Sequence, residues 1–283
     1  MREWQRAEGP GTYIIDPASG AEIARLMNQE ALMKRAVGGL IPEGIDLEHV
    51  SHVLDVACGP GGWVQDMAFT YPDLYVVGID TDQRVVAYAL AQARVQALSN
   101  ASFSVIDITQ PLPLPDASFD FINARFLSRL LLRETWADVM REAARVTRPG
   151  GWICLIEAEG YGETNSQALQ KMEALLMRAM ATDPWGRYAD IVPRLSRFLD
   201  EGGYQRRREG TYVIDCSADS VSHNGYYHNL KVAFKLLQPY MTRMGVAIQE
   251  ELDRLYERML WEVLSADFRG SWSLHSICGQ KAY

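Results

Sequence analysis

The chain has 283 residues, of which 48% are hydrophobic and 23% are charged, a composition typical of an ordinary globular protein. The 36 acidic residues outnumber the 28 basic ones, and the net charge of −8 argues against a general phosphate-binding surface for nucleic acid. No C-x-x-C spacing occurs, so neither a zinc nor a redox motif is predicted and no metal site is expected. Three of the four cysteines lie in apolar, strand-like runs and are expected to behave as small hydrophobic side chains. The four are Cys58, Cys154, Cys216 and Cys278.

The N-terminal segment MREWQRAEGPG has no apolar core, so it does not resemble a secretory signal peptide. No run approaches about 20 apolar residues, the length that a membrane-spanning helix requires. We therefore expect a soluble cytoplasmic protein, either a monomer or a homodimer, without membrane contacts.

The chain begins with a helical pattern over residues 17–38, which Gly38-Gly39 and Pro42 interrupt. Strands and helices then alternate up to residue 158. Strands are predicted at 51–57, 74–79, 101–106, 119–123 and 152–156, and helices at 63–69, 83–98 and 134–147. This alternation predicts a parallel, doubly wound sheet with right-handed crossovers. Such sheets bind ligands at the carboxyl ends of their strands.

The second half of the chain follows a different pattern. Helices are predicted at 166–182, at 190–201 and over 220–266, the last one kinked or split near Pro239 and Gly245. Strands are predicted at 209–216 and 271–283. The two late strands are separated by helical residues, which indicates an insertion at one end of the sheet. We expect a helical lid segment at 1–48, an α/β core at 49–160, and a C-terminal part at 161–283 with a helical cap insertion at about 219–268.

The stretch VLDVACGPGGWVQD, residues 53–66, joins the first strand to a helix through a loop with almost no side-chain bulk. A backbone that turns sharply and lets a ligand come close needs such residues. A strand, a glycine loop and a helix together place a ligand at the N-terminus of the helix. A dinucleotide-binding G-x-G-x-x-G motif would have its third glycine where Val64 stands, and the chain contains no P-loop motif.

The segment LDVACGPGGW resembles the first motif of the class I S-adenosylmethionine (SAM) dependent methyltransferases, an acid followed by small-x-Gly-x-Gly. Asp55, Ala57, Gly59 and Gly61 fill these places, with Ala57 where glycine is commoner. Four further segments follow in the family's order: VVGIDTD, FSVIDI, LPDASFDFINARFL and VTRPGGWICLIE. The resemblance covers roughly residues 12–160. It implies an α/β fold with a doubly wound, seven-stranded, mostly parallel sheet and a helical cap.

The resemblance also implies the cofactor, which is SAM, with S-adenosylhomocysteine (SAH) as its product. Asp80 would accept the two ribose hydroxyls, and Asp107 with the apolar Ile108 would hold the adenine. Thr81 and Asn123, which follow or end neighbouring strands, and Tyr13, which precedes the first helix, complete the expected cofactor-binding set. Taken alone, each of the two aspartates is equally consistent with a turn or helix cap.

Four residues are considered around the expected reaction centre. Arg125 either holds a carboxylate or pairs with Glu157. Glu157 and Glu159 share one face if their strand continues, and they would otherwise be strand-end residues facing water. Tyr13 either covers the SAM sulfonium, with a cation–π contact, or anchors the N-terminal segment.

The stretch SVSHNGYYHNL, residues 220–230, concentrates histidine and tyrosine at the start of the predicted insertion. We predict His223 as a catalytic base or as the group that orients an acceptor hydroxyl, since its ordinary pKa near 6.5 suits proton removal at neutral pH. The alternative is that it only begins the insertion helix. Methionines in the predicted cap helices either pack these helices together or form a pliable apolar pocket.

The leading hypothesis is a SAM-dependent methyltransferase acting on a small, apolar or aromatic metabolite by O-, N- or C-methylation. A second hypothesis keeps the fold but uses SAM non-catalytically or catalyses another reaction. A nicotinamide-dependent reductase is a third, and it predicts the loop glycine that is missing. The partner implied is a small-molecule methyl acceptor.

Overall fold

The computed structural model describes residues 13–16, 19–188 and 190–282, and within them eight strands form one sheet. The strand order is β3-β2-β1-β4-β5-β8-β6. Strand β7 lies off this path and pairs with β8. The strands are β1 (His52–Val56), β2 (Tyr75–Asp80), β3 (Ala101–Val105), β4 (Phe119–Arg125), β5 (Thr147–Ala158), β6 (Glu163–Thr164), β7 (Tyr204–Asp215) and β8 (Gly270–Lys281). The doubly wound α/β class is confirmed, but the expected count of seven strands omitted the two-residue β6.

The first five strands are parallel, and β8 joins them antiparallel to β5. Neighbouring residues of one strand face opposite sides of the sheet. Val53 and Phe121 pack on one face with α2 (Gly62–Thr70), whereas Leu54 and Ile122 pack on the other with α4 (Trp136–Val146). Both faces of the central strands are therefore buried, which explains their nearly continuous apolar sequences.

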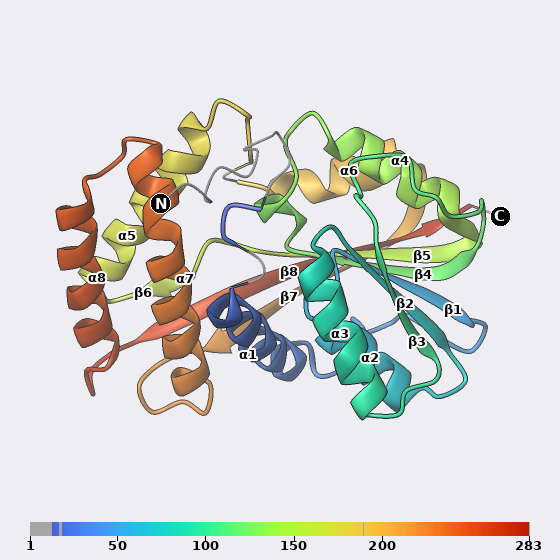
Figure 1. The fold of residues 1–283 in the computed structure, drawn as a ribbon, viewed down its shortest axis with the longest axis horizontal. Helices are drawn as coiled ribbons and strands as arrows, with labels where there is room; N and C mark the ends of the chain where they lie inside the picture. Colours follow the sequence, from blue (N-terminus) through green and yellow to red (C-terminus); the bar gives the residue numbers. More distant parts are fainter. Residues whose placement is uncertain (1–12, 17–18, 189, 283) are drawn as a thin grey trace.

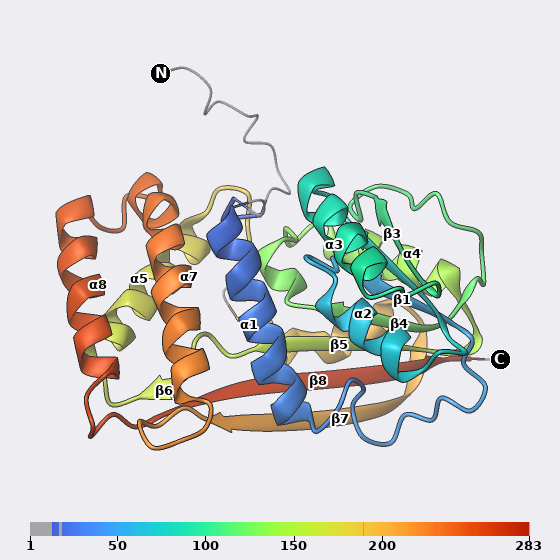
Figure 2. The ribbon, with the colours of Figure 1, turned by 60° about the horizontal axis from the view of Figure 1, so that its bottom comes forward.

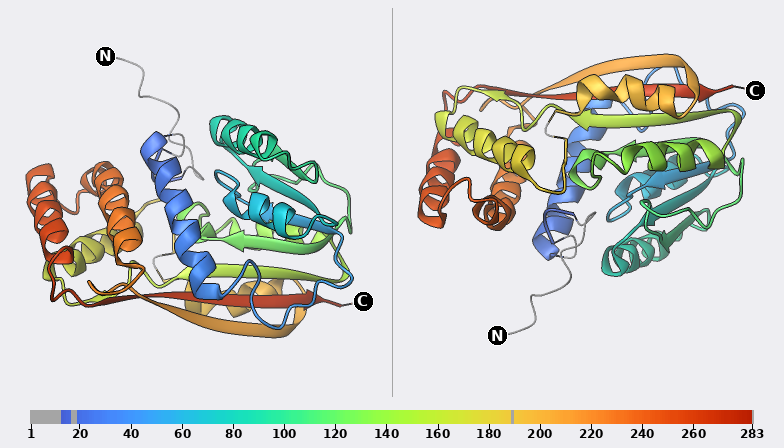
Figure 3. Two further views of the ribbon diagram at one scale, coloured as in Figure 1. Left: turned by 90° about the horizontal axis from the view of Figure 1, so that it is seen from below. Right: turned by 90° about the horizontal axis from the view of Figure 1, so that it is seen from above.

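Helices cover both faces of the sheet. One view of Figure 3 has α2 and α3 (Gln83–Val95) in front, and the opposite view has α4 and α6 (Leu195–Glu201) in front. Local capping fixes where some helices begin. The carboxylate of Asp82 accepts the backbone N–H groups of Arg84 and Val85 at the start of α3. Two short 3₁₀ helices, η1 (Leu127–Arg129) and η2 (Val192–Arg194), follow β4 and precede α6.

Four helices form a cap beside the parallel half of the sheet: α1 (Gly20–Val37), α5 (Gln167–Thr182), α7 (His223–Arg243) and α8 (Gln249–Val263). Figures 1 and 2 show α5, α7 and α8 at one end of the molecule and α1 between them and α2. Both α7 and α8 lie between β7 and β8 along the chain. The long helical stretch divides at Gly245, which has a φ of 67°, while Pro239 lies within α7. No described helix is long and apolar enough to cross a membrane.

The cap has its own hydrophobic core. Methionine and aromatic side chains from all four helices meet there, including Met33, Met172, Phe234 and Met259. Met172 and Met259 fill the space between helices, as the packing alternative predicts, whereas Met33 also lines the cavity described below, as the pocket alternative predicts.

Cys154 and Cys278 form a disulfide between β5 and β8, where they stand directly opposite each other. The expectation that the cysteines act as small hydrophobic residues was wrong for this pair. The two residues are 124 positions apart, and only the antiparallel register of β5 and β8 brings them together. Cys58 and Cys216 are buried thiols.

Candidate functional site

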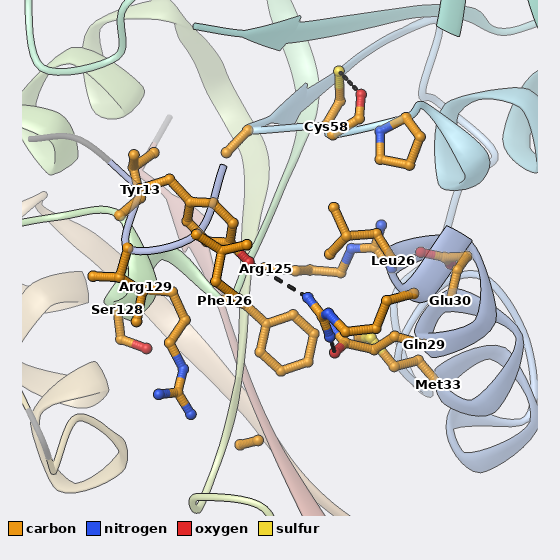
Figure 4. Close-up of a pocket in the computed structure, with 18 of the residues that line it drawn as sticks. Tyr13, Leu26, Gln29, Glu30, Met33, Cys58, Arg125, Phe126, Ser128 and Arg129 are labelled. Atoms are coloured by element: carbon orange, nitrogen blue, oxygen red, sulfur yellow. Dashed lines mark hydrogen bonds and ion pairs between the residues drawn. The ribbon is translucent and has the colours of Figure 1, made fainter. Parts of the chain in front are cut away.

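A cavity lies at the carboxyl ends of the parallel strands, where α1 and the segment around Tyr13 cover them (Figure 4). It encloses about 1360 Å³ of space free of protein atoms, its open mouth included. The loop after β1, the ends of β2, β4 and β5, helix α1, and single residues of α7 and β8 supply its lining. This is the edge at which doubly wound sheets bind ligands.

Positive φ angles alternate along the loop after β1, at Ala57 (56°), Gly59 (54°) and Gly61 (79°). A Cβ at Gly61 would lie 2.6 Å from the ring of Phe103, so packing alone requires glycine there. A Cβ at Gly59 would meet only the side chain of Leu26, at 3.7 Å, and both residues line the cavity. Gly59 therefore leaves the loop backbone open to the cavity, whereas Gly61 shapes the loop from behind and does not line it.

Asp80 ends β2 and lines the cavity together with Thr81. One oxygen of its carboxylate accepts the backbone N–H of Gly59 at 2.9 Å, and the other accepts that of Asp82 at 3.1 Å. Burial raises the pKa of Asp80, and these backbone donors oppose the rise. The carboxylate thus fixes the glycine loop of β1 to the end of β2.

Asp55 and Asn123 are register neighbours on β1 and β4, and both are buried without lining the cavity. The Asn123 side-chain amide donates to Asp55 at 2.7 Å. Arg125 reaches Glu30 on α1 at 2.7 Å and lies 4.0 Å from the second oxygen of Asp55. Burial raises the pKa of Asp55 to about 7, although Arg125 opposes this. The alternative that Arg125 pairs with Glu157 was wrong, because Arg125 pairs with Glu30 instead.

Glu157 lies near the end of β5, where its side chain is only 2% exposed and lines the cavity. The backbone N–H of Ser128 donates to one carboxylate oxygen at 2.9 Å, and the hydroxyl of Ser128 donates to the other at 2.7 Å. Burial raises the pKa of Glu157 to about 7, against the effect of these hydrogen bonds. The alternative that it faces water was wrong, whereas Glu159 is exposed beside His275.

Tyr13 lines the cavity and is also anchored, so both of its predicted roles are compatible with its position. Its hydroxyl donates to Glu22 at 2.9 Å and accepts from Arg25 at 3.4 Å. The guanidinium of Arg25 pairs with both oxygens of the buried Glu22 and donates to Asn229 on α7 at 2.8 Å. This cluster fixes the segment around Tyr13 to α1 and α7.

His223 lies outside the cavity lining, which corrects its prediction as a base facing the pocket. It is the first residue of α7, its Nδ1 lies 3.0 Å from the backbone oxygen of Cys216, and its ring packs against Phe268. Helix α7 reaches the cavity only at Leu237, about 20 Å further along the helix axis. His223 therefore begins the insertion helix, which is the alternative that the sequence offered for it.

Asp107 and Ile108 also lie outside the cavity lining. The carboxylate of Asp107 is exposed and accepts the backbone N–H and the hydroxyl of Thr109, at 2.9 and 2.7 Å. Ile108 is buried in the core on the α4 side of the sheet. Their contacts to adenine stay a prediction.

Sequence reasoning missed Glu30, Ser128, Arg129 and Tyr161, all of which line the cavity. Arg129 lies over the ring of Tyr161, with 5.3 Å from its guanidinium carbon to the ring centroid. The only sequence signal for Arg129 was its position four residues after Arg125. Arg125 itself follows a strand that is predicted to end at the site.

Residues 53–151 match a family model described as a methyltransferase domain. An N-methyltransferase (verN) of Clonostachys rogersoniana is 29% identical over 149 residues, which are 52% of this chain and 50% of that protein. This chain therefore spans about half the length of that relative. A trans-aconitate 2-methyltransferase of Delftia acidovorans is 26% identical over 222 residues, covering 75% of this chain and 79% of that protein.

A solved structure of Haemonchus contortus phosphoethanolamine N-methyltransferase 2, in complex with S-adenosyl-L-methionine, has a similar fold. Its TM-score is 0.54 at 15% identity, over 94% of this chain and 57% of that one. The two proteins therefore share the fold in which the cavity lies.

Proposed function

We propose that this chain is a class I S-adenosylmethionine-dependent methyltransferase and that it methylates a small molecule held in the cavity. The observation that supports this most is the hydrogen bond that joins the glycine loop to Asp80 in the lining of the cavity. A carboxylate and an open backbone meet there, at the carboxyl ends of two neighbouring parallel strands.

The residues at this end of the cavity fit SAM. The Asp80 carboxylate would accept the ribose hydroxyls in charge-assisted hydrogen bonds, with Thr81 beside it. Gly59 has no side chain in the way of a ligand approaching the loop. When bound, SAM supplies a methyl group activated by its sulfonium, and SAH is the product.

Glu157 is our candidate for the general base. Both of its oxygens are held by Ser128, so its position is fixed, and a pKa of about 7 leaves roughly half of it ionised at neutral pH. In its ionised form it would take the proton that an acceptor hydroxyl or amine loses on methylation. An acceptor that reacts as a free base would not need this step.

The cover of the cavity would orient the acceptor and exclude water. The Arg25–Glu22 cluster holds Tyr13 over the site, and the aromatic side chains of Phe126, Tyr161 and Trp272 line its other side. These surfaces suit an acceptor with an apolar or aromatic body.

Methyl transfer is tested by incubating the protein with SAM carrying a radiolabelled methyl group and a small-molecule cell extract. We expect label to move from SAM into a small-molecule product, and no label to move when the protein is omitted. If the protein binds SAH but transfers no label to any fraction, the SAM site is used for something other than methyl transfer.

A further inference from the structure

The charged side chains that line the cavity are not equally neutralised. Arg25 pairs with Glu22, and Arg125 pairs with Glu30, each at 2.7 Å. Within the described part of the chain, Arg129 has no carboxylate oxygen within 4.0 Å of its guanidinium nitrogens. Its guanidinium instead contacts the ring of Tyr161 and the sulfur of Met180, the latter 3.4 Å from Nη1.

The acids nearest to Arg129 are already engaged elsewhere. Glu157 accepts two hydrogen bonds from Ser128. Glu173 accepts the backbone N–H of Tyr161 at 2.7 Å. The positive charge of Arg129 opposes the rise in pKa that burial causes in both carboxyl groups, but neither group forms an ion pair with it. A cation that is half-buried among a tyrosine ring and a thioether lacks the counter-ion that such a site favours.

Arg129 lies at the end of the cavity away from the proposed cofactor site. Asp80 ends β2, and the cavity continues past β1 and β4 to the end of β5, three strand spacings or about 14 Å further. Arg129 follows β4 and contacts Tyr161, which follows β5. Figure 4 shows Arg129 on the side of the cavity opposite Glu30 and apart from the Arg125–Glu30 pair.

The surroundings of Arg129 are apolar and aromatic. The rings of Phe126 and Trp272 stack at 6.2 Å, and both line the same cavity as Leu237 of α7. A ligand here would place an apolar body against these side chains and one negative group against the guanidinium. A single guanidinium neutralises one charge and matches the two oxygens of a carboxylate.

We propose that Arg129 binds a carboxylate of the methyl acceptor, so that the substrates are small carboxylic acids with an apolar or aromatic body. This inference rests on the proposed function, because it assigns the acceptor end of the same cavity. Arg125, which sequence analysis considered for this role, is already neutralised by Glu30.

The test uses two pairs of probes that match in size and shape but differ in charge: phenylacetate with phenylacetamide, and hexanoate with hexanamide. Titration calorimetry on the SAH-loaded protein should show each carboxylate binding about tenfold or more tightly than its amide. Arg129→Met should remove this preference, and Arg129→Lys should keep part of it. Arg194→Met is the matched control, since Arg194 also lies over a tyrosine ring, at 4.8 Å from Tyr188, but is exposed and outside the cavity lining.

The possible outcomes separate this inference from the proposed function. Wild-type protein that binds SAH but shows no preference for either carboxylate at millimolar concentration overturns the inference alone. So does a preference that survives in Arg129→Met. A loss of SAH affinity in Arg129→Met, with the probe preference unchanged, would assign the guanidinium to the carboxylate of the cofactor. Wild-type protein that fails to bind SAH contradicts the proposed function itself.

Discussion

Asp80→Ala should weaken the binding of SAH by about 1.5–3 kcal/mol, which corresponds to roughly 10- to 150-fold in Kd. The substitution removes the carboxylate proposed to accept the ribose hydroxyls. It also frees the backbone N–H groups of Gly59 and Asp82, so the glycine loop loses one of its hydrogen bonds to the end of β2. Titration calorimetry with SAH measures the effect directly.

Asp66→Ala is the control for the Asp80 variant. Asp66 is an aspartate outside the cavity lining whose side chain pairs with Lys34 at the surface. We expect this variant to bind SAH as the wild type does. An Asp80→Ala protein that is folded and keeps wild-type affinity for SAH would refute the assignment of Asp80 to the ribose.

Glu157→Gln should lower kcat by about 100-fold with an acceptor that must lose a proton, within the range usual for a general base. Glutamine keeps the size of the side chain and can still accept the backbone N–H of Ser128 and donate to its hydroxyl. For the wild type, kcat/KM should rise with pH below about 7 and level off above it, since the ionised form of Glu157 takes the proton. The variant should lose this dependence while binding SAH normally.

The same carboxyl group makes a prediction about stability. Burial holds the pKa of Glu157 at about 7 in the folded protein, above its ordinary value of 4.5, so the folded state favours the protonated form. The stability of the wild type relative to Glu157→Gln is therefore greatest below pH 4.5. It should fall by about 3 kcal/mol as the pH rises through 7. Asp55 titrates in the same range, but it is present in both proteins and its effect cancels.

Urea unfolding of the two proteins across this pH range provides the measurement. A difference in unfolding free energy that does not change with pH would show that folding does not shift the pKa of Glu157. A kcat and pH profile unchanged by the substitution would leave the orientation of the substrate, without a base, as the contribution of the chain to the reaction.

The central part of the fold could be predicted because its signals are local. Asp55, Asp80 and Glu157 lie within one residue of the ends of apolar strands, and each end is marked by a change from apolar to polar or glycine residues in the sequence itself. The parallel sheet then brings these ends to one edge. The glycine loop was recognisable for the same reason, as consecutive residues form it.

The parts that sequence reasoning missed depend on long-range packing. Nothing in the sequence of α1 marks Glu30 as the partner of Arg125, since only the seating of α1 on the strand ends brings the two together. His223 was predicted to lie at the site because it begins the insertion. The hydrophobic periodicity of a sequence indicates how long a helix is, but it does not indicate where on the sheet the helix starts. Arg129 became a candidate only when the partners of the other arginines were known.

Titration calorimetry of the wild-type protein with SAH, and in parallel with NADH, tests the central claim most directly. We predict that SAH binds at one site per chain and that NADH binds no more than weakly, because Val64 stands where a dinucleotide site needs its third glycine. Tight binding of NADH without binding of SAH would contradict the account.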